Sequence, residues 1–458
     1  MMHFVNREQE LAALEDWWSR PDAGIALLWG RRRVGKTALA QRFAEGRRTL
    51  FHTASSRPPA DELEAVSRLA VATIDTGLRD LAARPFTDWI DALETLAESA
   101  RQEPLLLVLD EFPELLKSAG ELEGVLRAVW DRVRDRTGLR ILLCGSATRV
   151  MEKIQEERAP LYGRADLRLL LHPFRPHEAA AMLGGLDPAD RALVWGLVGG
   201  VPLYLEWWNT GTSIEDNLTR LVCTPGGRLL TEGAFVLATE GTSGDLSRQV
   251  LSAIASGRTR YNEIESAVRT PPARVLESLV ELRLVERVVP VTEDPRRTRR
   301  RIYRIADNFL AFWLGVVERY RAEIERGLGR SILDVLRADL DDHLGSRWEE
   351  AFRMHLRRMA ADGALGRDVV AVGPFWGTGR DPGEIDAVVL AGRSRTAILV
   401  GEAKWAHRVD GRRTSVALER KSAALRLREG HLEFAVCARE EVTGEGSFLR
   451  ITATDIFG

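Results

Sequence analysis

The residues best suited to chemistry are the glycines, lysine and threonine of one short run. Residues 30–37 fit the phosphate-binding pattern G-x-x-x-x-G-K-[ST], and they follow the apolar run Ile25–Trp29, which predicts a buried strand. In this pattern Gly30 and Gly35 let the backbone curl so that successive N–H groups face a polyphosphate, and the next helix adds its positive end. Lys36 is expected to reach the β- and γ-phosphates, and the hydroxyl of Thr37 to bind Mg²⁺. The run predicts a nucleoside triphosphate site.

A second pair of reactive side chains, Asp110 and Glu111, ends the apolar run that begins at Leu105. Such a run predicts a central parallel strand that delivers acids to the carboxyl edge of the sheet, where ligands bind. There Asp110 would hold Mg²⁺, directly or through water, and Glu111 would orient or deprotonate the attacking water. The alternative is a strand that ends in a solvated turn, and the phosphate-binding run favours the catalytic interpretation over it.

Two further polar positions are candidates for contact with the phosphates. Ser146 follows the predicted strand Leu139–Cys144, and its hydroxyl or that of Thr148 would hydrogen-bond the γ-phosphate or its water. The alternative is that Thr148 simply caps the next helix. Arg164 follows the core strands on a loop, where it would either stabilise charge on the transferred phosphate or form a structural ion pair.

A separate set of acids lies in the C-terminal third, on two strand-like segments joined by a polar turn. A hairpin centred on Ser394 would place Asp386 directly opposite Glu402. Two carboxylates at that separation repel each other and require a cation, for which Mg²⁺ or Mn²⁺ is the natural partner. Lys404, on the same face, would activate a hydrolytic water or offset phosphate charge. The alternative is a structural hairpin with a surface ion pair between Glu402 and Lys404.

Between these two sites the hydrophobic pattern changes. Three helical periods occupy residues 246–282, and two apolar segments, 284–291 and 301–305, flank a polar turn, which is the order of a winged helix-turn-helix. The turn and its second segment carry enough arginines to contact nucleic-acid phosphates: Arg296, Arg297, Arg299, Arg300, Arg301 and Arg304. Glu277 and Glu281 on the third helix oppose docking in a major groove, which favours a lid or protein-contact module with a solvated basic turn.

The succession of motifs from the N-terminus to about residue 210 resembles the archaeal-type ATPase family, a branch of the AAA-like and STAND P-loop ATPases. The residues that carry the resemblance are Arg7-Glu8, Gly30 to Thr37, Asp110-Glu111, Gly145-Ser146, Pro160 to Arg164 and Gly199 to Pro202. The resemblance implies an ATP-binding core with a helical lid and Arg7 in the segment presented to the adenine. It also implies Arg164 near the phosphates and Pro202 near the nucleotide. ATP and Mg²⁺ are therefore the expected cofactors.

The C-terminal acids resemble those of the PD-(D/E)xK nuclease superfamily, in which an acid on one strand is followed by E-x-K on the next. Asp386 supplies the first acid here, and Glu402-Ala403-Lys404 the second element. The resemblance implies a metal-binding acid on the preceding helix, for which Glu350 is the first choice and Glu349 its rival. It also implies that Lys421 contacts substrate phosphate. A nuclease fold without activity is the alternative, since fold does not establish activity.

Composition sets the remaining bounds. The chain has 458 residues, enough for about three domains, and 65 Lys and Arg against 67 Asp and Glu give a net charge of −2. Any nucleic-acid surface must therefore be local. Three scattered cysteines form no metal or disulfide pattern, the N-terminus lacks the layout of a signal peptide, and no apolar run approaches membrane-spanning length. These features predict a cytoplasmic protein without a membrane partner.

We therefore expect an α/β multidomain protein in four parts. They are a P-loop NTPase core with a parallel sheet (1–172), a helical lid (173–240), a winged helix-turn-helix (241–325) and a restriction-endonuclease-like α/β domain (326–458). The predicted function is ATP binding and hydrolysis that controls a Mg-dependent nuclease-like domain acting on DNA or RNA. The alternatives are an ATP-dependent regulatory switch that works through assembly of a homo-oligomer, and a DNA-binding transcription regulator.

Overall fold

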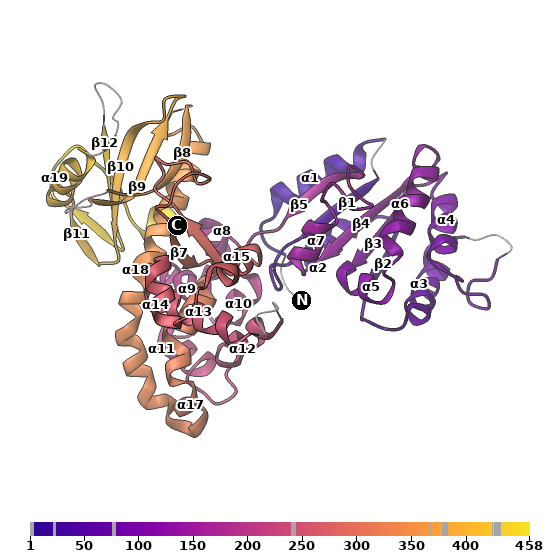
Figure 1. Ribbon diagram of the computed structural model, residues 1–458, viewed down its shortest axis with the longest axis horizontal. Coiled ribbons are helices and arrows are strands. Elements are labelled where there is room, and N and C mark those ends of the chain that lie inside the picture. Colours follow the sequence, from indigo (N-terminus) through magenta and orange to yellow (C-terminus); the bar gives the residue numbers. More distant parts are fainter. Residues whose placement is uncertain are drawn as a thin grey trace. The chain divides into compact units, whose positions relative to one another are not determined.

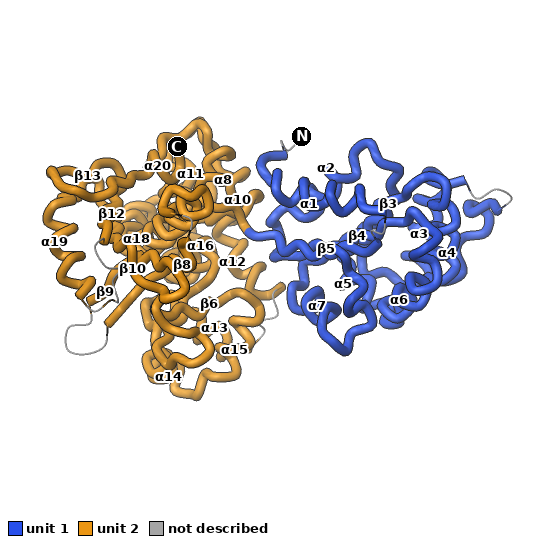
Figure 2. The backbone as a smooth tube through the Cα atoms, turned by 90° about the horizontal axis from the view of Figure 1, so that it is seen from above, with its two compact units in different colours: residues 1–172 blue, residues 173–458 orange. Residues whose placement is uncertain are grey.

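The computed structural model describes residues 4–21, 24–75, 79–239, 244–366, 368–377, 383–423, 425 and 432–458. The chain forms two compact units, residues 1–172 and 173–458, which we describe separately (Figure 2). The predictions made for residues 1–3 and for the boundary between residues 240 and 241 lie outside the described residues.

The first unit is built on a five-stranded parallel sheet (Figure 1). In the spatial order β2-β3-β4-β1-β5, its strands are β2 (Thr49–Thr53), β3 (Leu105–Asp110), β4 (Leu139–Gly145), β1 (Ile25–Trp29) and β5 (Ala165–Leu170). All neighbouring pairs run parallel. The carboxyl ends of the strands therefore share one edge of the sheet, and loops that follow different strands meet there.

Helices cover both faces of this sheet. Successive side chains of a strand point to opposite faces, so Leu27 packs in one hydrophobic cluster and Leu28 in the other. One face is covered by α1 (Glu8–Ser19) and α2 (Lys36–Ala44). The other is covered by α3 (Pro59–Thr73), α4 (Trp89–Ser99), α5 (Phe112–Ser118), α6 (Leu122–Val133) and α7 (Thr148–Lys153), with a 3₁₀ turn at Arg134–Arg136. Helix α3 ends at Thr73, because the backbone of Ile74 is extended.

The second unit begins with helices and a small ribbon. The segment expected to form a lid contains α8 (Pro176–Ala180), α9 (Pro188–Val198), α10 (Pro202–Trp207), α11 (Ile214–Leu221) and α12 (Arg228–Thr239), with a 3₁₀ turn at Ala181–Leu183. There follow α13 (Asp245–Ala255), α14 (Tyr261–Val268), α15 (Ala273–Glu281) and an antiparallel ribbon of β6 (Val285–Val288) and β7 (Ile302–Ile305). Strand β6 ends earlier than predicted, before Pro290, which has no N–H for a ladder.

The aromatic-rich segment that follows β7, residues 308–328, is an irregular helix. It consists of α16 (Asn308–Phe312), a π-helical turn (Trp313–Val317), a 3₁₀ turn (Glu318–Tyr320), α17 (Arg321–Glu323) and a second π-helical turn (Ile324–Leu328). Helix α18 (Gly329–Ala361) continues from it and is the longest element of the described chain.

A mixed five-stranded sheet follows α18 (Figure 1). In the order β14-β12-β10-β9-β8, its strands are β14 (Leu449–Ile451), β12 (Glu433–Ala438), β10 (Thr396–Lys404), β9 (Glu384–Ala391) and β8 (Val369–Trp376). Helix α18 packs on one face, and α19 (Gly411–Ser422) packs on the other. The remaining elements are the short parallel pair β11 (Arg408–Asp410) and β13 (Glu441–Thr443), and α20 (Ala453–Phe457).

One hydrophobic cluster runs through the second unit, from Phe174 to Phe457. It includes residues of the lid helices, of α13 to α15, of α18 and of one face of the C-terminal sheet. The three parts expected for this half of the chain therefore share a core and form one compact unit. In the described part of the chain, none of the helices combines the length and apolarity needed to span a membrane.

Candidate nucleotide site and C-terminal acid site

The phosphate loop connects β1 to α2 through two glycines that no other residue replaces easily. A Cβ on Gly30 would lie 2.3 Å from the carbonyl oxygen of Leu171, closer than the sum of the two van der Waals radii. Gly35 has a φ of 94° and precedes the first residue of α2, a conformation that side chains with a Cβ disfavour. These two positions shape the loop and direct the N-terminus of α2 toward it.

Lys36 and Thr37 occupy the positions expected of them at the start of α2. The buried ammonium of Lys36 donates hydrogen bonds to the carbonyl oxygens of Gly30 and Arg31, both at 2.9 Å. The hydroxyl of Thr37 donates to Asp110 Oδ2 at 2.9 Å. Asp110 ends β3, which is separated from β1 by β4 alone, so the parallel order brings this acid to the loop.

The surroundings of Asp110 fit a divalent cation. Its side chain is 1% exposed, and Oδ1 is buried without a hydrogen-bond partner in the described structure. Burial raises the pKa of Asp110. The effect of burial outweighs that of the hydrogen bond from Thr37, which lowers the pKa. A buried carboxylate oxygen with no partner beside a threonine hydroxyl is a suitable donor set for Mg²⁺. Bound there, Mg²⁺ would neutralise charge on the phosphates.

Glu111 is held in a strained backbone conformation next to the end of β4. Its φ is 52°, in the left-handed region that residues other than glycine avoid. Its Oε2 accepts a hydrogen bond of 2.7 Å from the hydroxyl of Ser146. The alternative role of Thr148 as a helix cap is wrong: Ala147 is the N-cap of α7, Thr148 is its first residue, and the hydroxyl of Thr148 is buried without a described partner.

Arg7 lies against the phosphate loop, and its predicted place in a segment presented to the adenine stays a prediction. Its guanidinium donates to the carbonyl oxygen of Val34 in the loop at 3.0 Å and to that of His172 at 2.7 Å. It also pairs with Glu10 at 3.0 Å. The residue is buried and has a φ of 72°. Arg7 therefore ties the segment before α1 to the nucleotide loop.

The prediction that Arg164 lies near the phosphates of its own chain is wrong. Ala165, the first residue of β5, pairs with Ile25, the first residue of β1. Arg164 therefore lies at the amino edge of the sheet, one strand length from the phosphate loop, roughly 15 Å for five residues. Its guanidinium forms two hydrogen bonds of 2.8 Å with Asp131. The alternative of a structural ion pair describes this residue.

Pro202 is the first residue of α10 and is buried in the second unit. Its expected position near the nucleotide joins residues of two separate units and stays a prediction.

In the second unit, β9 and β10 bring the predicted acids together. Ala387 pairs with Gly401, and the same register continued by one residue sets Asp386 opposite Glu402. This is the register of a hairpin centred on Ser394. Asp386 is 9% and Glu402 7% exposed, so both carboxylates are largely removed from water. We refer to Asp386, Glu402 and Lys404 as the Asp386 site.

The two acids of this site have opposite electrostatic surroundings. Burial, with the nearby charges of Glu349 and Glu402, raises the pKa of Asp386 to about 7, although the backbone N–H of Ala403 donates to it at 2.8 Å. Burial also acts to raise the pKa of Glu402. The ammonium groups of Lys404 and Lys421, at 2.8 and 2.6 Å, outweigh burial and lower it. Lys421 thus reaches an acid of the site rather than open solvent.

Glu350, the first choice for the helical acid, is occupied by arginines. Its oxygens lie 2.8 Å from Arg353, 2.7 Å from Arg357 and 3.3 Å from Arg304. Burial acts to raise its pKa, but these three charges lower it to about 2. Glu349, its rival, has a raised pKa because it is buried. It is also close enough to Asp386 to raise that residue's pKa. These electrostatic surroundings favour Glu349 over Glu350 as the acid nearest to Asp386, although Glu349 also pairs with Arg353 at 3.6 Å.

Replacing Glu350 by glutamine should therefore destabilise the second unit, by about 3–5 kcal/mol, because it removes the nearest carboxylate from the charge of the fully buried Arg353, which Glu349 reaches only at 3.6 Å. The stabilisation from Glu350 should be present above pH 4.5 and lost as the pH falls toward 2, since its pKa is lower in the folded chain. Urea unfolding at pH 7 measures the loss. Glu349→Gln is the matched variant and should change stability by less than about 1 kcal/mol, because Glu349 has a single, longer ion pair of 3.6 Å with Arg353 and its burial disfavours its charge. Equal losses would contradict the assignment.

One supporting residue, Arg353, escaped the sequence interpretation. Arg353 is buried in α18 and donates to the backbone carbonyl oxygen of Asp386 at 2.7 Å, so it supports the Asp386 site from beneath. Its only sequence signal is its position three residues after Glu350. No group of three or more His, Cys, Asp or Glu side chains among the described residues is arranged to hold a metal ion.

Comparisons with known proteins match the two parts of the chain to different families. Residues 4–207 match a family described as an ATPase domain predominantly from Archaea, and residues 313–416 match a family of archaeal and bacterial proteins of unknown function. An uncharacterized protein of Methanocaldococcus jannaschii is 25% identical over 406 residues, which cover 88% of this chain and 87% of that protein. An uncharacterized ATP-binding protein of the same organism is 49% identical over 45 residues, 10% of this chain and 76% of that protein.

Among solved structures, a Walker-type ATPase of Pyrococcus abyssi matches with a TM-score of 0.51 and 20% identity, over 68% of this chain and 96% of that chain. At that identity the match shows the fold alone.

Proposed function

This chain belongs to the family of ATPase domains found predominantly in Archaea, and from that premise we propose that it binds and hydrolyses Mg·ATP to control a nuclease-like site in its C-terminal sheet. The observation that carries the first half is the contact between Thr37 and Asp110, with one oxygen of Asp110 buried and unpartnered. Free, scattered cysteines accord with a reducing cytoplasm.

The residues of the nucleotide site have separate roles in this proposal. Lys36 exchanges the loop carbonyl oxygens for phosphate oxygens when ATP binds, because an anion is the stronger acceptor. Thr37 and Asp110 hold the cation. Glu111 orients the attacking water after its carboxylate has separated from the hydroxyl of Ser146. The hydrogen bond between these two side chains therefore keeps the Glu111 carboxylate away from the water until the nucleotide is bound.

The second half of the proposal rests on the Asp386 site. The described acids are not arranged to hold a metal ion as they stand, so Asp386, Glu349 and Glu402 would share a divalent cation only after their side chains rearrange. Lys404 would then position the hydrolytic water or offset phosphate charge. Because Lys404 and Lys421 both pair with Glu402, a cation must displace at least one ammonium group. In this proposal, the binding and hydrolysis of ATP would control the displacement of that ammonium group from Glu402.

The Glu111→Gln variant tests the ATPase. It should lower the turnover of Mg·ATP about 100-fold or more while leaving ATP affinity within about twofold, because the amide keeps the size of the side chain but cannot take a proton. Hydrolysis at the wild-type rate would remove Glu111 from the mechanism. Ser146→Ala is the companion variant, and it should keep most of the turnover because it frees Glu111.

The nuclease half has its own test. Purified protein with Mg²⁺ or Mn²⁺ should cleave DNA or RNA to an extent that depends on ATP, and Lys404→Ala should stop the cleavage. Cleavage that survives this substitution would place the activity elsewhere.

The arrangement of ammonium groups favours a second candidate, an ATP-dependent regulatory switch without nuclease turnover. Two lysines already neutralise Glu402, and three arginines neutralise Glu350, so these acids are satisfied without a metal. In this case ATP controls assembly or partner binding. Chromatography with a non-hydrolysable ATP analogue distinguishes the two, since assembly without any cleavage supports the switch.

A further inference from the structure

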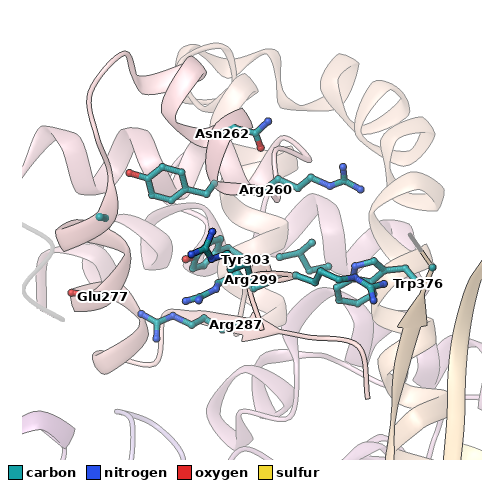
Figure 3. A pocket seen from close by; sticks show the side chains of 13 residues that line it. Arg260, Asn262, Glu277, Arg287, Arg299, Tyr303 and Trp376 are labelled. Carbon is teal, nitrogen blue, oxygen red and sulfur yellow. The ribbon is translucent and has the colours of Figure 1, made fainter. Parts of the chain in front are cut away.

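We propose that a pocket in the second unit binds single-stranded nucleic acid and presents it to the Asp386 site; the second clause rests on the proposed function, and the first does not. The pocket has a volume of about 670 Å³, within the range of roughly 300–1,000 Å³ of ligand sites in proteins. It lies between α14, α15, the β6–β7 ribbon and the end of β8 (Figure 3).

The pocket is strongly basic. Its lining includes Arg260, Arg287, Arg299, Arg300 and Arg301, against one acid, Glu277. Arg300 is neutralised by an ion pair with Glu293. Arg287 and Arg299 are exposed and pair with no carboxylate in the described part of the chain. Two uncompensated guanidinium groups that converge on one concavity are suited to bridge successive phosphates of a strand.

Aromatic rings line the same pocket. Tyr261 begins α14 and Trp376 ends β8, and both are partly exposed, so that their rings are open to a base. Tyr303 on β7 is only 5% exposed, so its ring is not open to stacking. Figure 3 shows Arg287, Arg299 and Tyr303 together, with Glu277 on one side and Trp376 on the other. A positive groove with aromatic side chains is the combination that holds unpaired bases by stacking while guanidinium groups contact their phosphates.

The geometry favours a single strand over a duplex. Ring faces inside a pocket stack only on bases that are not paired. A duplex that followed the third helix would instead meet the exposed carboxylates of Glu277 and Glu281, which repel its phosphates. The pocket and the basic turn therefore favour a single strand, whereas the third helix repels a duplex.

A short path leads from the pocket to the Asp386 site. Trp376 pairs with Glu384 in the β8–β9 register, and Glu384 is two residues before Asp386 on β9. On the other side of the pocket, Arg304 of β7 contacts Glu350 of α18 at 3.3 Å. A nucleic-acid strand stacked on Trp376 would thus leave the pocket along the part of the sheet that carries Asp386.

Binding is tested on the full chain in EDTA and without ATP, so that neither hydrolysis nor cleavage affects the result. Fluorescence anisotropy would use labelled oligo(dT), oligo(U) and a duplex of the same length, at several salt concentrations. We expect both single strands, or one of them, to bind at least tenfold more tightly than the duplex; the DNA and RNA arms identify the sugar. Equal or tighter binding of the duplex would overturn the proposal.

Paired variants locate the binding surface. Arg287→Ala with Arg299→Ala should weaken single-strand binding at least tenfold and reduce the slope of log affinity against log salt by about 1.4, near 0.7 for each phosphate contact. Arg296→Ala with Arg297→Ala removes the same charge from the turn that carries Arg299 but outside the pocket, and should weaken binding less than threefold. Trp376→Ala should weaken binding about tenfold without changing the slope. Equal effects of the two arginine pairs would refute the pocket.

The two proposals fail separately. Strand binding with no cleavage in Mg²⁺ or Mn²⁺ supports the pocket and contradicts the nuclease function. ATP hydrolysis without strand binding contradicts the pocket and leaves the ATPase intact.

Discussion

An alanine in place of Lys36 should lower the affinity for Mg·ATP at least about 100-fold, equal to about 3 kcal/mol. The ammonium of Lys36 is buried and bonded to two carbonyl oxygens of the phosphate loop, so its charge is held where the β- and γ-phosphates are expected. A charge-assisted contact to phosphate in a site shielded from water accounts for a loss of this size. Isothermal calorimetry or a fluorescent ATP analogue measures the affinity directly.

The control for Lys36→Ala is Lys117→Ala, which removes an exposed lysine that pairs with Glu114 in the same unit. That variant should leave ATP affinity unchanged within about twofold, because an exposed ion pair contributes little. Thermal unfolding should confirm that both variants fold. Wild-type affinity in a folded Lys36→Ala variant would show that the loop does not bind the polyphosphate through this residue.

The parts of the site that follow from local pattern are predictable from the sequence. The spacing of Gly30, Gly35 and Lys36 determines a loop, and the end of an apolar strand determines an acid at the carboxyl edge. Asp110 lies against Thr37 for that reason alone. The position of Asp386 opposite Glu402 is also predictable. Side chains alternate between the two faces of a strand, and a hairpin centred on Ser394 puts both acids on the same face. A bulge between Ala397 and Leu399 sets that register in the structure.

The errors arise where position depends on contacts distant in sequence. Arg164 precedes a strand instead of following one, and its place at the amino edge of the sheet depends on how β5 pairs with β1. Strand β5 itself escaped prediction, because its edge position gives it an alternating rather than a continuous apolar pattern. The choice between Glu349 and Glu350 depends on Arg304, which comes from a different element. Adjacent residues on a helix differ in direction by about 100°, and periodicity does not show which of them meets a partner.

Replacing Asp386 by asparagine should raise the free energy of unfolding of the second unit at pH 8, by roughly 4 kcal/mol. The pKa of Asp386 is about 7 in the folded chain against an ordinary value of 3.8, so between these values the folded chain holds a proton that the unfolded chain releases. Stability therefore falls as the pH rises through this interval, by about 1.4 kcal/mol for each unit of separation. Asparagine carries no charge, and its side-chain oxygen can accept the same hydrogen bond from the backbone N–H of Ala403.

Urea unfolding at pH 8 and at pH 4 measures this effect as the difference between variant and wild type. The gain should be largest at pH 8 and close to zero at pH 4, where the wild-type side chain is also neutral. Asp334→Asn, an exposed substitution on α18, should change stability by less than about 0.5 kcal/mol at both values. A gain that does not depend on pH would mean that the charge of Asp386 is not its cause.

The same pair of proteins separates the two candidate functions. If Asp386 and Glu402 share a cation, Mn²⁺ at pH 8 should stabilise the wild type and not the Asp386→Asn variant, because a ligand that binds only the folded chain raises its stability by mass action. The excess stability of the variant would then shrink as Mn²⁺ is added. If instead Lys404 and Lys421 neutralise the site permanently, the excess would stay the same at every Mn²⁺ concentration. That result would favour the regulatory switch, since an acid that costs stability and binds no metal has no place in a metal-dependent nuclease.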